Sequence, residues 1–330
     1  MTDKRIGDNP VMLDLHVDGT KVVGEILKYL KQIVERENSR GVALGLSGGM
    51  DSCILATLAV RALGPQSVTV VYIFDQDSDP NIARNARHIA DNLGLNLEEL
   101  DISEDMSKRG VYASAFTKLL RLSGLVAKIT TACYRIICGE TPFKSTLRVG
   151  GGETLRPWYK RLLFNMTMRH VEAGFIQRHI FRRNILERIA EERNLSLIGA
   201  ANRSECEVGW FVKDGIDDIP VQPLTGLFKT QIRQLAEELE LPEKIRKQIP
   251  SPDMAKGVTD EFGIGHEYCI VDTVIDGLDR GLTLEEISAL GIPQKDVVDI
   301  IDLMRLSKWK RMSPHEISPV NGSYGSAIRC

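Results

Sequence analysis

The chain has 330 residues, of which 43% are hydrophobic and 26% are charged, and this composition is typical of a folded globular protein. No apolar run approaches the roughly 20 residues that a membrane-spanning helix needs, and the polar residues 1–8 are not followed by the apolar segment of a secretory signal. We therefore expect a cytoplasmic protein without a membrane segment. The net charge of −3 argues against general binding of nucleic acids.

The charges are unevenly distributed along the chain. Residues 103–188 hold 16 Lys and Arg against 6 Asp and Glu, so this stretch carries a net charge of +10 and the remainder carries −13. A basic middle section of this kind indicates either an anionic ligand, such as a phosphorylated substrate, or a solvated basic helix face.

The first third of the chain alternates between helical and strand patterns. Apolar residues of 22–37 recur on one helical face, and the short apolar run 41–46 that follows is typical of a buried strand. Further strands are predicted at 68–74 and 97–102, and further helices at 54–63 and 81–93. Strand–helix alternation with short connections predicts an α/β fold with a doubly wound parallel sheet.

The remainder of the chain returns to this pattern after a long excursion. We expect a helix over 112–138, a Gly-, Thr- and Pro-rich loop over 139–157, and one long helix or two helices over 159–193. Another strand is predicted at 195–200, with helices at 229–239, 284–290 and 295–308. We therefore predict a single domain over residues 1–330, with a basic, mostly helical insertion at 103–193 and a C-terminal tail at 313–330.

Residues 47–52, with the sequence Ser-Gly-Gly-Met-Asp-Ser, lie between a predicted buried strand and a predicted helix. Glycines allow backbone N–H groups to close around an anion, and the following helix directs its positive end at that anion. The carboxylate of Asp51 beside a phosphate predicts a bridging Mg²⁺ ion. The segment lacks the lysine of a Walker A loop and the Gly-x-Gly-x-x-Gly of a dinucleotide fold.

This segment resembles the pyrophosphate loop of the N-type ATP pyrophosphatases. The resemblance implies that ATP is cleaved between its α and β phosphates, that AMP passes to a substrate oxygen, and that pyrophosphate is released. Further blocks are similar to the ammonia-dependent NAD synthetases, namely 197–236, with Ala-Ala-Asn-Arg-Ser-Glu and Pro-Leu-Thr-Gly-Leu-Phe-Lys, then 250–265 and 310–312. The likeness covers residues 22 to about 102 and about 181 to 313.

The resemblance implies a role for each residue that matches a family motif. Asp51 and Glu205 would bind Mg²⁺, and Asp51, Lys229 and Lys310 would take part in catalysis. The residues that would contact ATP are Ser47, Gly48, Gly49, Asp51, Ser52, Arg182, Lys213, Lys229 and Ser251. No protein nucleophile is needed, because the carboxylate of the substrate attacks the α-phosphate. We expect Asp260 and Glu261 only to begin a helix, outside the site.

The resemblance also implies the reaction. Deamido-NAD (nicotinate adenine dinucleotide) would be amidated to NAD through an acyl-adenylate, with ammonia as the nitrogen donor. Members of the family are homodimers, so a homodimer is expected. Only about 40 residues precede the first predicted strand, too few for a glutaminase domain, and we therefore expect free ammonia or ammonia from a separate subunit.

Four features depart from the family pattern. Within the loop 214–220, which belongs to the dinucleotide site in the family, Ile216 and Pro220 occupy two aspartate positions. Ala200 replaces a threonine, Trp309 replaces a histidine, and the segment 103–178 is longer than the family's connection. We hypothesise that the insertion forms a wall or lid over the acceptor; an interface between subunits is the other interpretation. The basic residues proposed for this wall are Arg135, Lys144, Arg148 and Arg156.

Two other functions stay open. An ATP pyrophosphatase of this type could adenylate a different carboxylate or act in sulfur transfer, for which paired cysteines are expected. Cys133 and Cys138 are the only close pair among six scattered cysteines, a pattern that favours reduced thiols over a metal site or disulfides. The chain could also be a regulatory nucleotide-binding protein, although the intact loop with Glu205 and Lys229 argues against this.

Overall fold

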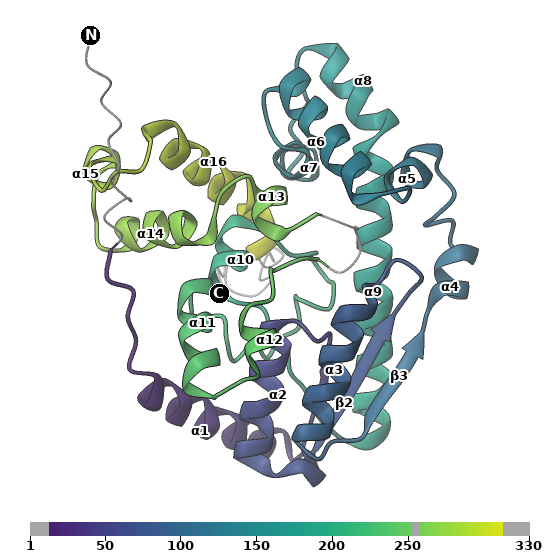
Figure 1. Cartoon of the computed structure of the whole chain (residues 1–330), viewed down its shortest axis with the longest axis vertical. Helices are drawn as coiled ribbons and strands as arrows, with labels where there is room; N and C mark the ends of the chain where they lie inside the picture. The colour runs from purple at the N-terminus through teal and green to yellow at the C-terminus, as the bar shows by residue number, and fades with distance from the viewer. Residues whose placement is uncertain (1–12, 253–257, 313–330) are drawn as a thin grey trace, which may run out of the picture.

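The computed structural model describes residues 13–252 and 258–312, and its centre is a parallel sheet of four strands (Figure 1). The strands are β1 (Val42–Gly45), β2 (Val68–Phe74), β3 (Leu97–Asp101) and β4 (Ser196–Leu197), in the order β3-β2-β1-β4. Val42 lies opposite both Val68 and Ser196, and Val70 lies opposite Leu97. The predicted α/β class and parallel sheet are confirmed.

The strand predicted at 195–200 is shorter than expected. After β4 the chain makes a single parallel bridge between Ile198 and Val221. Ile198 is buried in the core, and Gly199, Ala200 and Ala201 line a cavity. The apolar run 195–200 is therefore buried or half-buried throughout, although only two of its residues form a strand.

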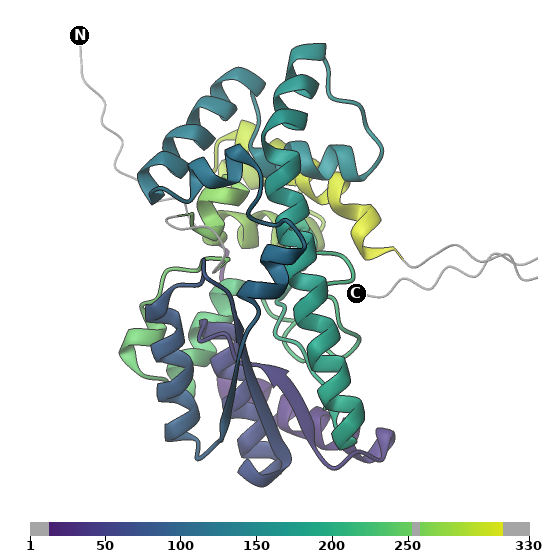
Figure 2. The ribbon, with the colours of Figure 1, turned by 90° about the vertical axis from the view of Figure 1, so that its right-hand side faces the viewer.

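Helices cover both faces of the sheet (Figure 2). One face packs against α1 (Gly19–Glu37), α2 (Met50–Leu63), α3 (Pro80–Asn92) and α11 (Lys229–Glu238), and a 3-10 turn, η1 (Pro65–Ser67), connects α2 to β2. The other face packs against α9 (Met168–Arg193). Because side chains alternate along a strand, Val70 and Tyr72 join the first core while Val71 and Ile73 join the second.

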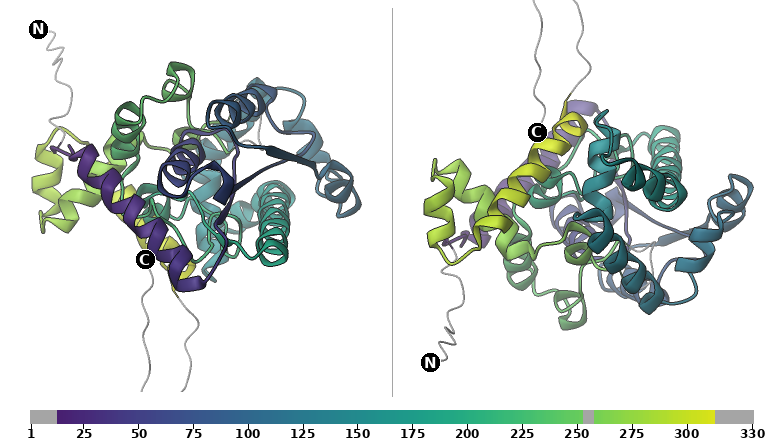
Figure 3. Two further views of the ribbon diagram at one scale, coloured as in Figure 1. Left: turned by 90° about the horizontal axis from the view of Figure 1, so that it is seen from below. Right: turned by 90° about the horizontal axis from the view of Figure 1, so that it is seen from above.

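The excursion between β3 and β4 forms a helical cap at the end of the molecule opposite α1 (Figure 3). It contains α4 (Ser103–Lys108), α5 (Ala115–Leu120), α6 (Gly124–Cys138), α7 (Pro142–Gly150) and α8 (Trp158–Met166). The helix predicted over 112–138 is two helices, and the span 159–193 is two helices as well.

The loop predicted over 139–157 is wrong, because α7 lies within it. Thr141 caps this helix by accepting a hydrogen bond from the backbone N–H of Lys144, and Pro142 occupies the first turn, where no N–H donor is needed. The glycines that suggested a loop stand at the end of α7, where Gly151 is the C-terminal cap.

The C-terminal part encloses a second core around Tyr268, Val271 and Leu303. Its helices are α10 (Arg203–Val208), α12 (Glu243–Arg246), α13 (Asp260–Ile264), α14 (Tyr268–Asp279), α15 (Leu284–Ala289) and α16 (Gln294–Arg311). The helices predicted at 284–290 and 295–308 are confirmed, whereas α14 was not foreseen. Residues 253–257 and the predicted tail at 313–330 lie outside the described residues. Within the described part, no helix has the length and apolar character to cross a membrane.

Candidate active site

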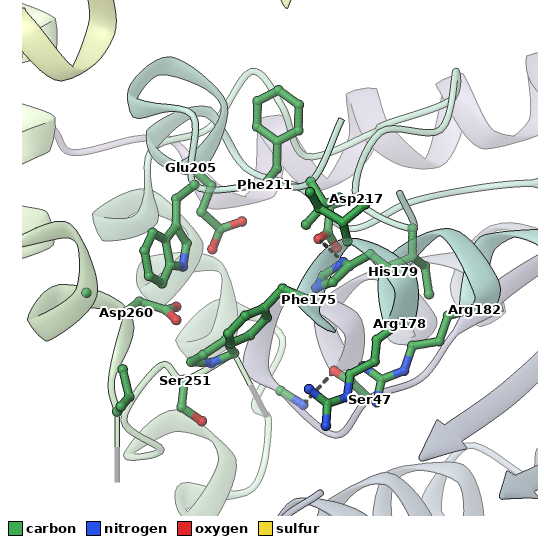
Figure 4. Close-up of a pocket in the computed structure, with 18 of the residues that line it drawn as sticks. Ser47, Phe175, Arg178, His179, Arg182, Glu205, Phe211, Asp217, Ser251 and Asp260 are labelled. Atoms are coloured by element: carbon green, nitrogen blue, oxygen red, sulfur yellow. Dashed lines mark hydrogen bonds and ion pairs between the residues drawn. The ribbon is translucent and has the colours of Figure 1, made fainter. Parts of the chain in front are cut away.

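A cavity of about 730 Å³ opens at the carboxyl end of β1 (Figure 4). Its walls come from the loop 47–52, from α9, from residues 198–217 and from the helical cap. This volume is in the range of small-molecule sites, and the carboxyl end of a parallel strand is where such folds bind ligands.

The loop 47–52 turns directly into α2 at the floor of this cavity. Gly48 has a φ of +86°, and a Cβ atom there would lie 2.2 Å from the carbonyl oxygen of Ile82, so only glycine fits. The Ser47 and Ser52 hydroxyls lie 3.0 Å apart. Gly49 precedes α2 without a side-chain cap, which leaves backbone donors at the helix N-terminus for an anion.

Arg182 on α9 is the guanidinium that is available to such an anion. Its side chain lines the cavity and is only 8% exposed, yet its Nε and Nη2 atoms have no hydrogen-bond partner among the described residues. Arg178, one turn earlier, is fully engaged, because its Nε and Nη2 atoms each lie 2.6 Å from a carboxylate oxygen of Asp75 or Asp77. Both arginines line the cavity, but only Arg182 has nitrogens that no protein acceptor occupies among the described residues.

Lys229 lies between the two carboxylates that were predicted to bind metal. Its Nζ atom is 2.8 Å from Asp51 and 3.2 Å from Glu205, and Asp51 also accepts a hydrogen bond of 2.7 Å from Asn202. Burial by itself would lower the pKa of Lys229, but the two carboxylates raise it. Burial and the neighbouring Asp51 raise the pKa of Glu205 to about 8, against the opposing effect of Lys229.

Asp260 and Tyr268 also belong to this cluster, although the sequence analysis placed Asp260 outside the site. The Tyr268 hydroxyl lies 3.3 Å from Asp260 and 3.4 Å from Glu205. Asp260 lines the cavity, burial raises its pKa to about 6, and its Oδ1 atom has no partner among the described residues. Asp260 does begin α13, but its N–H also binds the Pro250 carbonyl, which holds it beside Ser251.

The carboxylates of this cluster fit a divalent cation. Asp51, Glu205 and Asp260 lie around the single ammonium of Lys229, and the pKa of Glu205 is raised by burial first and then by the neighbouring Asp51 and Asp260. Within the described residues, no group of three His, Cys, Asp or Glu side chains could hold a metal by itself. A cation here would therefore depend on additional oxygen ligands, which the phosphates of ATP can supply.

Lys213 and Lys310 line the cavity, but both donate hydrogen bonds to backbone carbonyls. The Nζ atom of Lys213 lies 3.0 Å from the Lys310 carbonyl and 3.3 Å from the Met312 carbonyl. Lys310 donates to the carbonyls of Gly209 and Phe211, and burial lowers its pKa to about 8. Ser251 lines the same cavity on the side of Asp260.

The proposed basic wall over the acceptor is wrong. Lys144 and Arg148 point away from the cavity into ion pairs with α16, and neither Arg135 nor Arg156 lines it. The cap does form a wall, with apolar residues such as Leu120, Ala127 and Phe143, and the start of α9 continues it with Met168, Val171 and Phe175. These residues carry no motif, so their position could not be read from the sequence.

The altered loop 214–220 lies at the edge of the cavity. Ile216 packs near Gly45 and Leu186. Its neighbour Asp217 lines the cavity and lies 2.9 Å from His179. Burial by itself would raise the pKa of Asp217, but His179 and Arg182 lower it overall. The loop therefore still contributes an acidic group, Asp217, to the cavity.

A parallel sheet whose first strand ends in a glycine–serine loop, with an unpaired arginine and a carboxylate cluster above it, defines an ATP-using enzyme of the PP-loop class. The model of the NAD synthase family matches residues 22–137 and 160–314, and this chain belongs to that family. NAD synthases are ligases that form a carbon–nitrogen bond, so the predicted enzyme class is confirmed. The match also includes most of the excursion that was expected to lie outside it, and leaves only 138–159 unmatched between its two parts.

Curated relatives of this chain are NH3-dependent NAD⁺ synthetases. The NH3-dependent NAD⁺ synthetase of Thermotoga maritima is 30% identical over 261 residues, which are 79% of this chain and 88% of the relative. That of Hyperthermus butylicus is 30% identical over 311 residues, which are 93% of each chain.

Solved structures agree on the fold. The NMN synthetase of Francisella tularensis and the NH3-dependent NAD synthetase of Campylobacter jejuni each have a TM-score of 0.64 and 19% identity. Each comparison covers 92% of this chain and 100% of the other. At this identity the two structures support the PP-loop fold and nothing finer.

Proposed function

We propose that this chain converts deamido-NAD to NAD, with ATP as the activating substrate and ammonia as the nitrogen donor. Membership of the NAD synthase family and the names of the curated relatives support this reaction. The substrate carboxylate attacks the α-phosphate of ATP, pyrophosphate leaves, and ammonia then displaces AMP from the acyl-adenylate.

The observation that carries the proposal is the pairing of the loop 47–52 with Arg182 in one cavity. Backbone donors at the start of α2 and the serine hydroxyls would hold the leaving pyrophosphate. The two unpaired nitrogens of Arg182 would stabilise the negative charge that develops on the reacting phosphates. A buried guanidinium without a protein partner has a large desolvation cost, which an anionic ligand would offset.

Asp51 and Glu205 are the residues that would hold Mg²⁺, with Asp260 nearby as a third acid. The ion would neutralise phosphate charge when bound. Lys229 keeps the two carboxylates close together, since its ammonium contacts both, and so preserves the shape of the cation site.

The sulfur-transfer alternative is not favoured. Its thiols would have to reach the adenylated substrate, but no cysteine of the described residues lines the cavity. Cys138 is buried in a separate core beneath the cap, where burial raises its pKa, and Cys133 is exposed.

The test is NAD formation by the purified chain with ATP, Mg²⁺, ammonium and deamido-NAD, measured by chromatography together with AMP and pyrophosphate. We expect the three products in equal amounts and a requirement for all four reactants. Deamido-NMN serves as a second acceptor, because a structural neighbour is an NMN synthetase. Pyrophosphate release with another acid, in the absence of any amidation of deamido-NAD, would contradict the proposal.

A homodimer is also part of the proposal. The cap exposes apolar side chains on α6 and α8, including Leu125, Ile129, Ile136, Trp158 and Met166, and such a surface is typical of a protein interface. The cytoplasmic location stays a prediction from the sequence.

A further inference from the structure

Helix α7 belongs to residues 138–159, which the family model leaves unmatched. It nevertheless contributes Pro142, Phe143 and Thr146 to the wall of the active-site cavity. The stretch between the two matched parts therefore lines the candidate active site.

Two basic side chains fasten α7 to α16. The Nζ atom of Lys144 lies 2.6 Å from Asp299 and 2.7 Å from Asp302, and Arg148 lies 3.0 Å from Asp302. Although burial alone would lower the pKa of Lys144, its two carboxylate partners raise it. These partly buried ion pairs hold α7 at the cavity as a fixed wall.

Trp309 on α16 is fitted to the same helix. Its indole N–H donates to the Leu147 carbonyl over 3.3 Å. A Cβ atom on Gly150 would lie 2.6 Å from the Trp309 ring, and one on Gly151 would lie 3.0 Å from it. Trp309 and α7 are thus parts of one packing arrangement.

Phe143 is the α7 side chain that completes an aromatic enclosure. Its ring lies 4.7 Å from the Trp210 ring at an interplanar angle of 77°. The Nζ atom of Lys310 lies 5.9 Å from the Phe143 ring and 5.2 Å from the Phe211 ring. In Figure 4, Phe211 and Ser47 lie on opposite sides of the cavity.

We propose that Phe143 of α7 determines acceptor specificity by packing against the planar aromatic ring of the acceptor, with Lys310 as the neighbouring positive charge. This inference rests on the proposed function. Aromatic side chains pack on planar rings by edge and face contacts, and an ammonium has three N–H donors, of which Lys310 uses two for carbonyls. The third is available to an acceptor carboxylate or phosphate.

The acceptor is favoured over the adenine of ATP for this enclosure. Beside the loop 47–52, Gly45 and Ile73 of the sheet edge already supply an apolar surface for the base of the nucleotide. Phe143 and Phe211 both flank the Lys310 ammonium, and Phe211 lies across the cavity from Ser47, so the enclosure faces the space that a nucleotide at the loop 47–52 leaves to the acceptor.

The test compares the wild type with Phe143→Leu, which conserves apolar volume and removes the ring. We expect the KM for deamido-NAD to rise about tenfold, from the loss of ring contacts, while the KM for ATP changes less than about twofold. Phe164→Leu is the matched control, because Phe164 is buried in the cap core and does not line the cavity. An unchanged KM for deamido-NAD, or an equal rise in the KM for ATP, would overturn the inference.

Equilibrium binding separates this inference from the proposed function. Quenching of tryptophan fluorescence by deamido-NAD, with α,β-methylene-ATP present, reports binding without turnover, because Trp210 lies against Phe143. A Kd for deamido-NAD about tenfold higher in Phe143→Leu than in the wild type would support the subsite. If the wild type bound deamido-NAD but formed no NAD, that result would contradict the proposed reaction and leave the subsite supported. Equal Kd values for the two proteins would reject the subsite.

Discussion

Arg178 and Arg182 lie one helical turn apart on α9, and their surroundings give them different functions. Arg178 neutralises two buried carboxylates, whereas Arg182 has two buried nitrogens without a partner. A buried polar group that the fold leaves unpaired is a candidate for ligand binding, since the ligand can supply the missing acceptor.

The two arginines therefore predict opposite effects of the same substitution. Arg182→Gln should lower kcat/KM for ATP by about 10² to 10³, as for loss of a donor to developing charge, with an unfolding free energy that is unchanged or higher. Arg178→Gln should destabilise the fold by about 3–5 kcal/mol, because Asp75 would stay buried without its cationic partner and Asp77 would keep only Arg121. Steady-state kinetics and urea unfolding measure the two effects, and an active but unstable Arg182→Gln protein would contradict the assignment.

Glu172 predicts a pH dependence of stability. It lines the cavity, and burial raises its pKa from 4.5 to about 6, although Lys310 and the Thr146 hydroxyl act in the opposite direction. The folded state holds the Glu172 proton more tightly than the unfolded state does. The protonated Glu172 therefore contributes to the free energy of unfolding, and this contribution is fully present below pH 4.5 and is lost as the pH rises through 6. Glu172→Gln should remove the part of the loss of stability with rising pH that is due to Glu172. Melting temperatures of both proteins from pH 4 to 8 measure this difference. Parallel curves for both proteins would show that Glu172 titrates normally.

At the scale of elements, α7 shows how glycine content misleads a reading of local sequence. The glycines of 150–152 end the helix, and two of them also leave room for the Trp309 ring. That second function depends on a residue more than 150 positions away, since the Trp309 hydrogen bond to Leu147 spans 162 residues.

This contact predicts a coupled pair of substitutions. Gly150→Ala should cost about 1–3 kcal/mol, as for overpacking, because the new Cβ would lie 2.6 Å from the indole ring. In a Trp309→Leu background the same change should cost much less. A double-mutant cycle from urea unfolding gives the interaction energy, and additive costs would mean that the two residues do not meet.

For the whole molecule, the exposed apolar residues of the cap predict how copies associate. Ile136 is 83% exposed and Ile129 is 54% exposed on α6, so neither contributes much to the fold of one chain. Ile136→Asp should convert the proposed homodimer to monomers, because a desolvated charge would oppose the interface. Analytical ultracentrifugation measures the mass, with Val298→Asp, which is 48% exposed on α16, as the control. A dimer that survives the first change would place the interface elsewhere.

The sequence by itself determined the features that are local. The loop 47–52 and its flanking strand and helix are neighbours in the chain, so their pattern predicts the phosphate site and the parallel sheet. The motifs that contain Glu205 and Lys229 predict that these residues join Asp51 in the site. In the structure, Lys229 forms ion pairs with both Asp51 and Glu205.

Only the tertiary structure decided what depends on contacts between distant segments. It distinguishes Arg182 from Arg178, because both line the cavity but only Arg178 is paired with buried carboxylates, and it brings Asp260 to Glu205 through the side chain of Tyr268. It also turns Lys144 and Arg148 toward α16 and leaves Phe143 to face the cavity, an outcome of charge pairing across two helices that no local pattern could reveal.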